Sequence, residues 1–106
     1  MKLNIADSLK QLREEQLPFK TLFSHGSLEV EIYKPKRVDS QKPHARDEVY
    51  VVATGASHFI RGKEECPVIP GDVLFVPAGE EHRFVSFTDD FSTWVFFYGP
   101  DGGERS

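Results

Sequence analysis

Several features are scarce in this sequence, and each scarcity excludes a class of protein. Cys66 is the only cysteine among 106 residues, so no disulfide can form within the chain, as is usual in a reducing compartment. No apolar run is long enough to span a membrane, and residues 1–7 lack the apolar core of a signal peptide. Positive charge is also scarce, because 13 Lys and Arg face 17 Asp and Glu, for a net charge of -4. We therefore expect a cytoplasmic protein whose partners are neither nucleic acid nor membrane.

The chain also lacks internal repeats and low-complexity segments, and its length predicts one domain over residues 1–106. Residues 1–18 are expected to form a helical segment, with the helix at 4–16. Asp7 or Ser8 is the expected cap, and Pro18 ends the segment. The pattern predicts β structure over 28–98 and a flexible tail at 99–106.

Short strand patterns fill the rest of the chain. Residues 28–33 alternate between apolar and polar, which indicates one buried face. Residues 48–53 are apolar at nearly every position, which predicts cover on both faces, from a second sheet and from a neighbouring chain. We therefore expect a homodimer. Seven or eight short strands with regular turns favour a sandwich or a barrel. The expected strands are 19–24, 28–33, 48–53, 57–61, 64–69, 73–76, 82–87 and 92–98.

One stretch reads as strand, tight turn, strand, with an imidazole just after the turn. Gly71 opens it within turn-forming residues, an apolar run follows, and Pro77 ends the strand because proline cannot donate to a strand ladder. Gly79 lets the chain turn back, and His82 begins the next strand. Ser86 stands four residues after His82.

A second stretch lies upstream, where His44, Glu48 and Gly55 precede and close the apolar strand. In this order, the two stretches resemble the paired motifs of the cupin superfamily over about residues 28–98, in particular those of small single-domain cupins with a cupin-2-like conserved barrel. Two positions depart from the motifs: Lys42 stands where the first His is usual, and Ser86 where Asn is usual. The resemblance implies an all-β fold, a double-sheet jelly-roll β-barrel with, in this chain, a short N-terminal helix.

The resemblance also implies a metal site. His44 and Glu48 are four residues apart, so on a strand they share a face, and the cupin arrangement would bring His82 to them from another strand. Two imidazoles and one carboxylate suit a divalent transition metal, namely iron, manganese, nickel, copper or zinc, and leave coordination positions open. Lys42 has two alternatives. If it points inward it pairs with Glu48 and blocks the metal; if it points outward the three-ligand site remains.

Four further residues are candidates for lining a pocket around the metal: Lys42, Arg46, Tyr50 and Phe84. Tyr50 and Phe84 each lie two residues beyond a candidate ligand, so they either line the pocket or fill the core. Arg46 shares the face of His44 and Glu48, and either meets a carboxylate substrate or is solvated at the strand entrance.

Three functions are compatible with these residues. The first is a metal-dependent enzyme of the oxygenase or isomerase type that acts on a small molecule. The second is a non-catalytic module that binds a small molecule or a metal, and the third is a metal-free barrel blocked by Lys42. The sequence has no nucleophile motif and no second acid–base pair, so it does not name a reaction or decide whether the protein is an enzyme.

Overall fold

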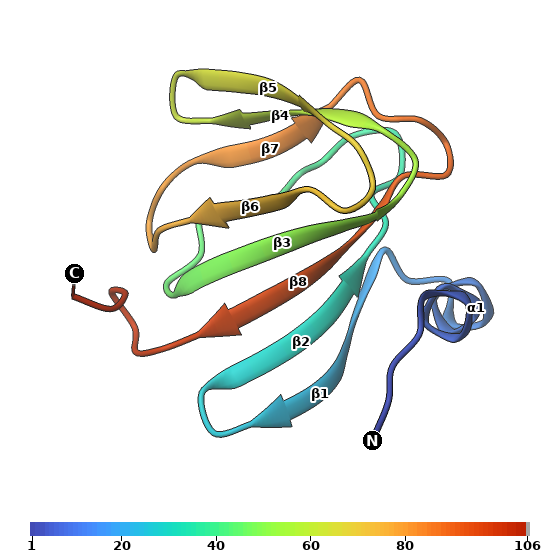
Figure 1. Cartoon of the computed structure of the whole chain (residues 1–106), viewed down its shortest axis with the longest axis horizontal. Coiled ribbons are helices and arrows are strands. Elements are labelled where there is room, and N and C mark those ends of the chain that lie inside the picture. Colours follow the sequence, from blue (N-terminus) through green and yellow to red (C-terminus); the bar gives the residue numbers. More distant parts are fainter. Residues whose placement is uncertain (106) are drawn as a thin grey trace.

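The computed structural model describes residues 1–105. Within these residues, one short helix precedes eight strands that form two antiparallel sheets (Figure 1). The elements are α1 (Ile5–Glu15), β1 (Phe19–His25), β2 (Leu28–Tyr33), β3 (Asp47–Thr54), β4 (Ser57–Arg61), β5 (Glu64–Val68), β6 (Val73–Val76), β7 (His82–Val85) and β8 (Ser92–Tyr98).

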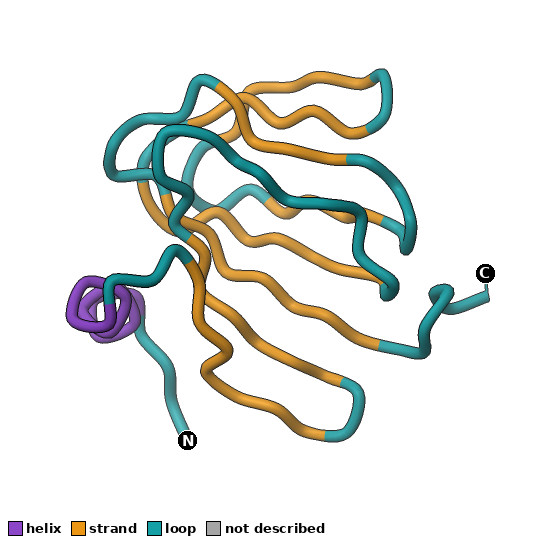
Figure 2. Tube along the Cα trace, turned by 180° about the vertical axis from the view of Figure 1, so that it is seen from behind, coloured by secondary structure: helices purple, strands orange, loops and turns teal. Residues whose placement is uncertain are grey.

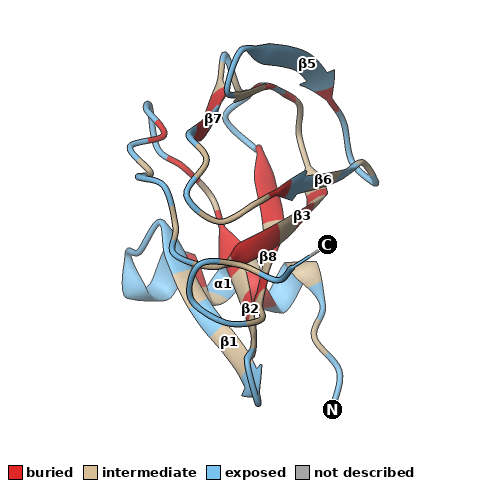
Figure 3. Cartoon of the chain, turned by 90° about the vertical axis from the view of Figure 1, so that its left-hand side faces the viewer, coloured by how far each residue is buried: buried red, intermediate tan, exposed pale blue. Residues whose placement is uncertain are grey.

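The two sheets build the double-sheet jelly roll that the sequence predicts. The larger sheet has the order β1-β2-β8-β3-β6, and the smaller has the order β5-β4-β7. Figure 3 shows that the buried segments of β3, β7 and β8 face the space between the sheets. The described strands do not close into one continuous hydrogen-bonded ring, since β6 and β7 belong to different sheets.

The side chains of strand β3 alternate between the inner and outer faces of the larger sheet. Glu48 lies opposite Phe97 and Val76, and all three side chains are buried on the inner face. Val49 and Val51 alternate with this set and point outward, as strand geometry requires. The outer face is apolar across five strands. Its apolar residues include Phe23, Leu28, Val30, Ile32, Val49, Val51, Val73, Phe75, Trp94 and Phe96.

Helix α1 lies beside the β1–β2 hairpin at the margin of the larger sheet (Figure 2). Its cap is Asn4, whose side chain accepts the Asp7 N–H, so the expectation of a cap at Asp7 or Ser8 is wrong. Asn4 is the N-cap because the helix begins at Ile5, and the Asp7 N–H in its first turn has no partner within the helix. Ser8 instead lies within the helix, where it is buried, and its hydroxyl donates to the Asn4 carbonyl. No helix in the described part of the chain has the length and hydropathy needed to cross a membrane.

Two residues of the motifs occupy left-handed backbone positions at strand ends. Gly55, between β3 and β4, has a φ of 72°, and a Cβ there would lie 2.6 Å from the backbone of Phe91, so only glycine fits. Ser86 has a φ of 52° and ends β7 at Val85, two residues before the expected end of this strand. Asparagine adopts this conformation more readily than serine, which gives a physical reason for the usual Asn at this motif position.

Candidate metal centre

The three candidate ligands come from separate elements that the backbone ties together. His44 lies in the loop before β3, Glu48 lies on β3, and His82 is the first residue of β7. The turn between β6 and β7 binds the start of β3, because the Gly79 N–H donates to the His44 carbonyl at 2.8 Å. The Ala78 N–H likewise donates to the buried Asp47 carboxylate at 2.9 Å. These bonds hold the two motifs at a fixed separation.

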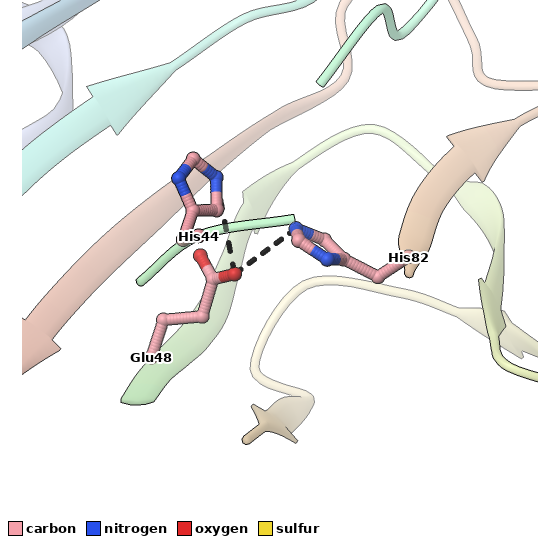
Figure 4. A group of neighbouring side chains, drawn as sticks. All are labelled: His44, Glu48 and His82. Carbon is pink, nitrogen blue, oxygen red and sulfur yellow. Dashed lines mark ion pairs between the residues drawn. The ribbon is translucent and has the colours of Figure 1, made fainter. Parts of the chain in front are cut away.

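The three side chains converge between the sheets (Figure 4). His82 Nε2 lies 3.0 Å from Glu48 Oε1, and His44 Nε2 lies 3.9 Å from the same oxygen. One potential ligand atom from each residue lies within 4.8 Å of the other two. The structure therefore brings together the same three residues that the sequence predicts as a metal site.

The buried polar atoms of this group lack hydrogen-bond partners. Glu48 is 1% exposed, and neither of its oxygens forms a hydrogen bond within the described chain. His82 Nε2 is also without one, because its 3.0 Å approach to Glu48 is not aligned as a hydrogen bond. The other ring nitrogen of His82, Nδ1, lies 3.0 Å from the Glu80 carbonyl and donates to it. This bond leaves the lone pair of Nε2 facing the carboxylate, as in a metal-ligating histidine.

The electrostatics of the two imidazoles differ. Burial lowers the pKa of His44 and outweighs the opposing attraction of Glu48, so His44 is neutral and able to bind a metal at neutral pH. Burial also lowers the pKa of His82, but the Glu48 carboxylate and the Glu80 carbonyl outweigh it and raise the pKa overall. The group thus attracts a positive charge between His82 and Glu48, which either a proton or a metal ion supplies.

Lys42 and Arg46 lie outside this group. Lys42 is exposed and forms no ion pair with Glu48 within residues 1–105, so the outward alternative describes its position. It lines a cavity of about 260 Å³ on the His82 side of the site. Arg46 binds the Glu29 carboxylate at 2.7 Å and the Ser27 carbonyl, so its charge is already paired.

Tyr50 and Phe84 lie in the closed core beside His82. Their rings are 5.0 Å apart, and both residues are at most 1% exposed. Burial, reinforced by the Glu48 charge, raises the pKa of Tyr50 well above its ordinary value, so its hydroxyl stays protonated and acts as a donor. The hydroxyl donates to Gln41 Oε1 at 3.1 Å.

The largest cavity near the site has a volume of about 500 Å³ and opens beside His44. Its wall includes Glu31, Tyr33, Gln41 and Phe97, none of which the sequence patterns single out. Glu31 and Tyr33 lie on the inner face of β2, opposite the buried Val95 and Thr93 of β8. The alternation at 28–33 instead favours burial of the opposite, apolar face, so it does not single out Glu31. Gln41 and its neighbour Asp39 lie in a loop without periodicity, so no signal marks them.

A curated protein matches part of this chain. A Streptomyces coelicolor protein, "Uncharacterized protein SCO3923", is 44% identical over 63 residues, which make up 59% of this chain. The match spans about 60% of the length of that relative.

Solved structures share the fold. A Rhizobium leguminosarum structure of unknown function has a TM-score of 0.69 at 22% identity and covers 94% of this chain and 97% of its own. A chain from the crystal structures of the DMSP lyases RdDddP and RnDddQII has a TM-score of 0.63 at 25% identity, over 73% of this chain and 41% of that one. The Cupin_2 family, described as a cupin domain, matches residues 29–98. The chain therefore belongs to the cupin family, as its two motifs predict.

Proposed function

We propose that this cupin binds a divalent transition metal through His44, Glu48 and His82, and binds a small molecule next to it. The observation that carries the proposal is the set of buried atoms without partners, namely both Glu48 oxygens and His82 Nε2. A buried carboxylate costs several kcal/mol unless a cation or hydrogen bonds compensate it. A metal ion supplies that compensation, and the neutral His44 beside it needs no deprotonation to bind.

A metal held by two imidazoles and one carboxylate acts as a Lewis acid and keeps coordination positions for water, substrate or dioxygen. The donor set suits iron, manganese, nickel, copper or zinc. Within the chain, His82 Nδ1–H on the Glu80 carbonyl fixes the ring so that Nε2 faces Glu48. The burial of Glu48 and His82 keeps bulk water away from these two groups.

The small molecule binds in the cavity of about 500 Å³ next to His44. Val95 and Phe97 give this cavity an apolar wall, and Glu31, Gln41 and His44 give it polar groups. Such a lining suits a compact ligand with an apolar body and one or two polar groups.

An enzymatic role of the oxygenase or isomerase type is favoured by Glu31. Burial raises the pKa of this carboxyl above its ordinary value, and it lines the same cavity as His44, so it is placed to exchange a proton with a bound molecule. The similarity to a chain from the DMSP lyase structures is a second reason, separate from the metal site, to test the protein for reactions on small molecules. Without turnover, the same site is a binding module.

The proposal includes a homodimer formed through the outer face of the larger sheet. Val73 and Phe75 on β6 are 66% and 44% exposed, and the neighbouring outward residues are also apolar. An exposed apolar patch of this kind is typical of an interface, and a second copy of the chain would bring the same patch to it about a twofold axis. Sedimentation should give a mass twice 12.1 kDa, and Phe75→Lys should halve it, whereas Leu17→Lys, outside this face, should not. A wild-type mass of one chain at micromolar concentration contradicts the dimer.

The metal itself is tested by elemental analysis of tag-free protein before and after incubation with Mn²⁺, Fe²⁺, Co²⁺, Ni²⁺ and Zn²⁺. We expect near-stoichiometric metal in the wild type and in Glu64→Gln, an exchange on exposed β5. Glu48→Gln and His82→Ala should lose it. Wild-type protein that retains none of these ions contradicts the proposed function.

A further inference from the structure

A buried carboxylate outside the metal group organises the loop that crosses the site. Asp39 is 3% exposed and accepts four hydrogen bonds. Two come from the Tyr33 hydroxyl and the Phe84 N–H, each at 2.7 Å. The other two come from Gln41, from its backbone N–H at 3.1 Å and its side-chain Nε2 at 3.0 Å. These donors fill the acceptor sites of the carboxylate, so Asp39 is an anchor for the loop and not a metal ligand.

This anchor fixes the orientation of the Gln41 amide. Because Nε2 donates to Asp39, the amide oxygen must point the other way, toward the metal group. There Oε1 accepts the Tyr50 hydroxyl at 3.1 Å and lies 3.2 Å from His44 Nε2.

We infer that the Gln41 amide oxygen is a fourth protein ligand for the metal, and this inference rests on the proposed function. Two ligand atoms bound at about 2.0–2.2 Å and at right angles lie roughly 3 Å apart. The 3.2 Å between Gln41 Oε1 and His44 Nε2 meets this condition, as does the 3.0 Å between Glu48 Oε1 and His82 Nε2. Gln41 thus takes the role that the exposed Lys42 leaves empty, one position earlier in the chain.

The competing explanation is that Gln41 only positions His44. In that case His44 Nε2 carries a proton and donates it to Gln41 Oε1, and the imidazole uses its other nitrogen toward the metal. Removal of Gln41 would then weaken metal binding without a change in the number of ligands. A measurement of coordination number therefore separates a ligand from a positioning residue.

The test is titration of metal-free protein with Co²⁺ alone. Two quantities are measured: the affinity for Co²⁺ and the visible d–d absorption of the bound ion. This absorption becomes stronger as the coordination number falls. We expect Gln41→Leu to weaken binding by at least about 10–100-fold, the loss typical even of outer-shell partners. We also expect its d–d bands to change in intensity. Gln41→Asn, which keeps the amide but withdraws it by one methylene, should behave in the same way if Gln41→Leu fails to fold. Gln11→Leu, the same exchange on helix α1, should match the wild type.

The outcomes separate the two proposals. The fourth ligand is supported if the wild type binds Co²⁺ and both Gln41 variants bind it more weakly and show altered d–d bands. Weaker binding with unchanged bands, or unchanged binding, overturns it and leaves the three-residue site in place. Failure of the wild type to bind Co²⁺ overturns the fourth ligand together with the metal site.

Discussion

Replacement of Glu48 by methionine should make the metal-free protein more stable while it abolishes metal binding. Glu48 is 1% exposed, and neither of its oxygens has a hydrogen-bond partner in residues 1–105. In the absence of metal, the fold therefore carries a buried charge compensated only by His82, 3.0 Å away and poorly aligned. Methionine has nearly the same length and volume, so it fills the space without the charge.

The magnitude is bounded by exchanges of whole buried ion pairs for apolar side chains. Such exchanges are neutral or stabilise by about 1–4 kcal/mol, and a gain in this range raises the Tm of a domain of this size by roughly 4–16 °C. Here only Glu48 is exchanged, and His82 is expected to lose its proton once the carboxylate that raises its pKa is gone. Metal should act in the opposite sense. At a concentration 100 times its Kd, it stabilises the wild type by about 2.7 kcal/mol and leaves Glu48→Met unchanged.

The assay is urea unfolding of EDTA-treated, dialysed protein, with and without Zn²⁺, followed by the fluorescence of Trp94, the only tryptophan. Glu64→Met, the same exchange on exposed β5, should change the free energy of unfolding by less than about 0.5 kcal/mol. A metal-free Glu48→Met protein that is less stable than the metal-free wild type refutes the reasoning, because the carboxylate would then be compensated within the chain.

Three further predictions concern the framework. Gly55→Ala should lower the free energy of urea unfolding by about 2–5 kcal/mol, because a left-handed φ of 72° is combined with a clash against the Phe91 backbone. Gly26→Ala, with a φ of 58° and open space around it, should lower it by only about 1–2 kcal/mol. Equal losses would contradict the clash. Ser86→Asn should raise the Tm by a few degrees, since asparagine relieves part of the roughly 1–2 kcal/mol left-handed penalty, and a lower Tm argues against this. Burial raises the pKa of Glu31 above its usual 4.5, so the native state loses stability as pH rises from 4 toward 7; Glu31→Gln should remove this slope, and parallel pH profiles for both proteins would refute it.

Local and periodic signals were sufficient to predict the strands, and the resemblance of the two motifs to cupins then selected the jelly roll. Alternation at 28–33 and the apolar run at 48–53 correspond to β2 and β3, and Pro77 and Gly79 form the turn between β6 and β7. The helix cap and the end of β7 were missed by a few residues. The cap was missed because the helix begins at Ile5, which makes Asn4 the residue before it, and the end of β7 depends on the left-handed backbone of Ser86.

The candidate ligands could also be placed from the sequence, because motif spacing and strand parity together put Glu48 and His82 on inward faces. The position of Lys42 could not be derived in this way. It lies in a loop between Val38 and Pro43, where no period fixes which side chain turns inward. The structure resolves the choice through Asp39, whose hydrogen bonds to two distant strands hold the loop and turn Gln41 inward instead.

With the proposed ligands, loss of a motif histidine need not mean loss of metal binding. The unpaired atoms of Glu48 and His82 are set by the sheets, and a substitution in the loop leaves them unpaired. Under the proposal, the Gln41 amide oxygen, 3.2 Å from His44 Nε2, completes the set of ligands. Under the same proposal, Asp39 matters more than residue 42, because it orients Gln41. A chain with histidine at 42 but without Asp39 would have the ligand in its sequence and lack the anchor that orients the loop.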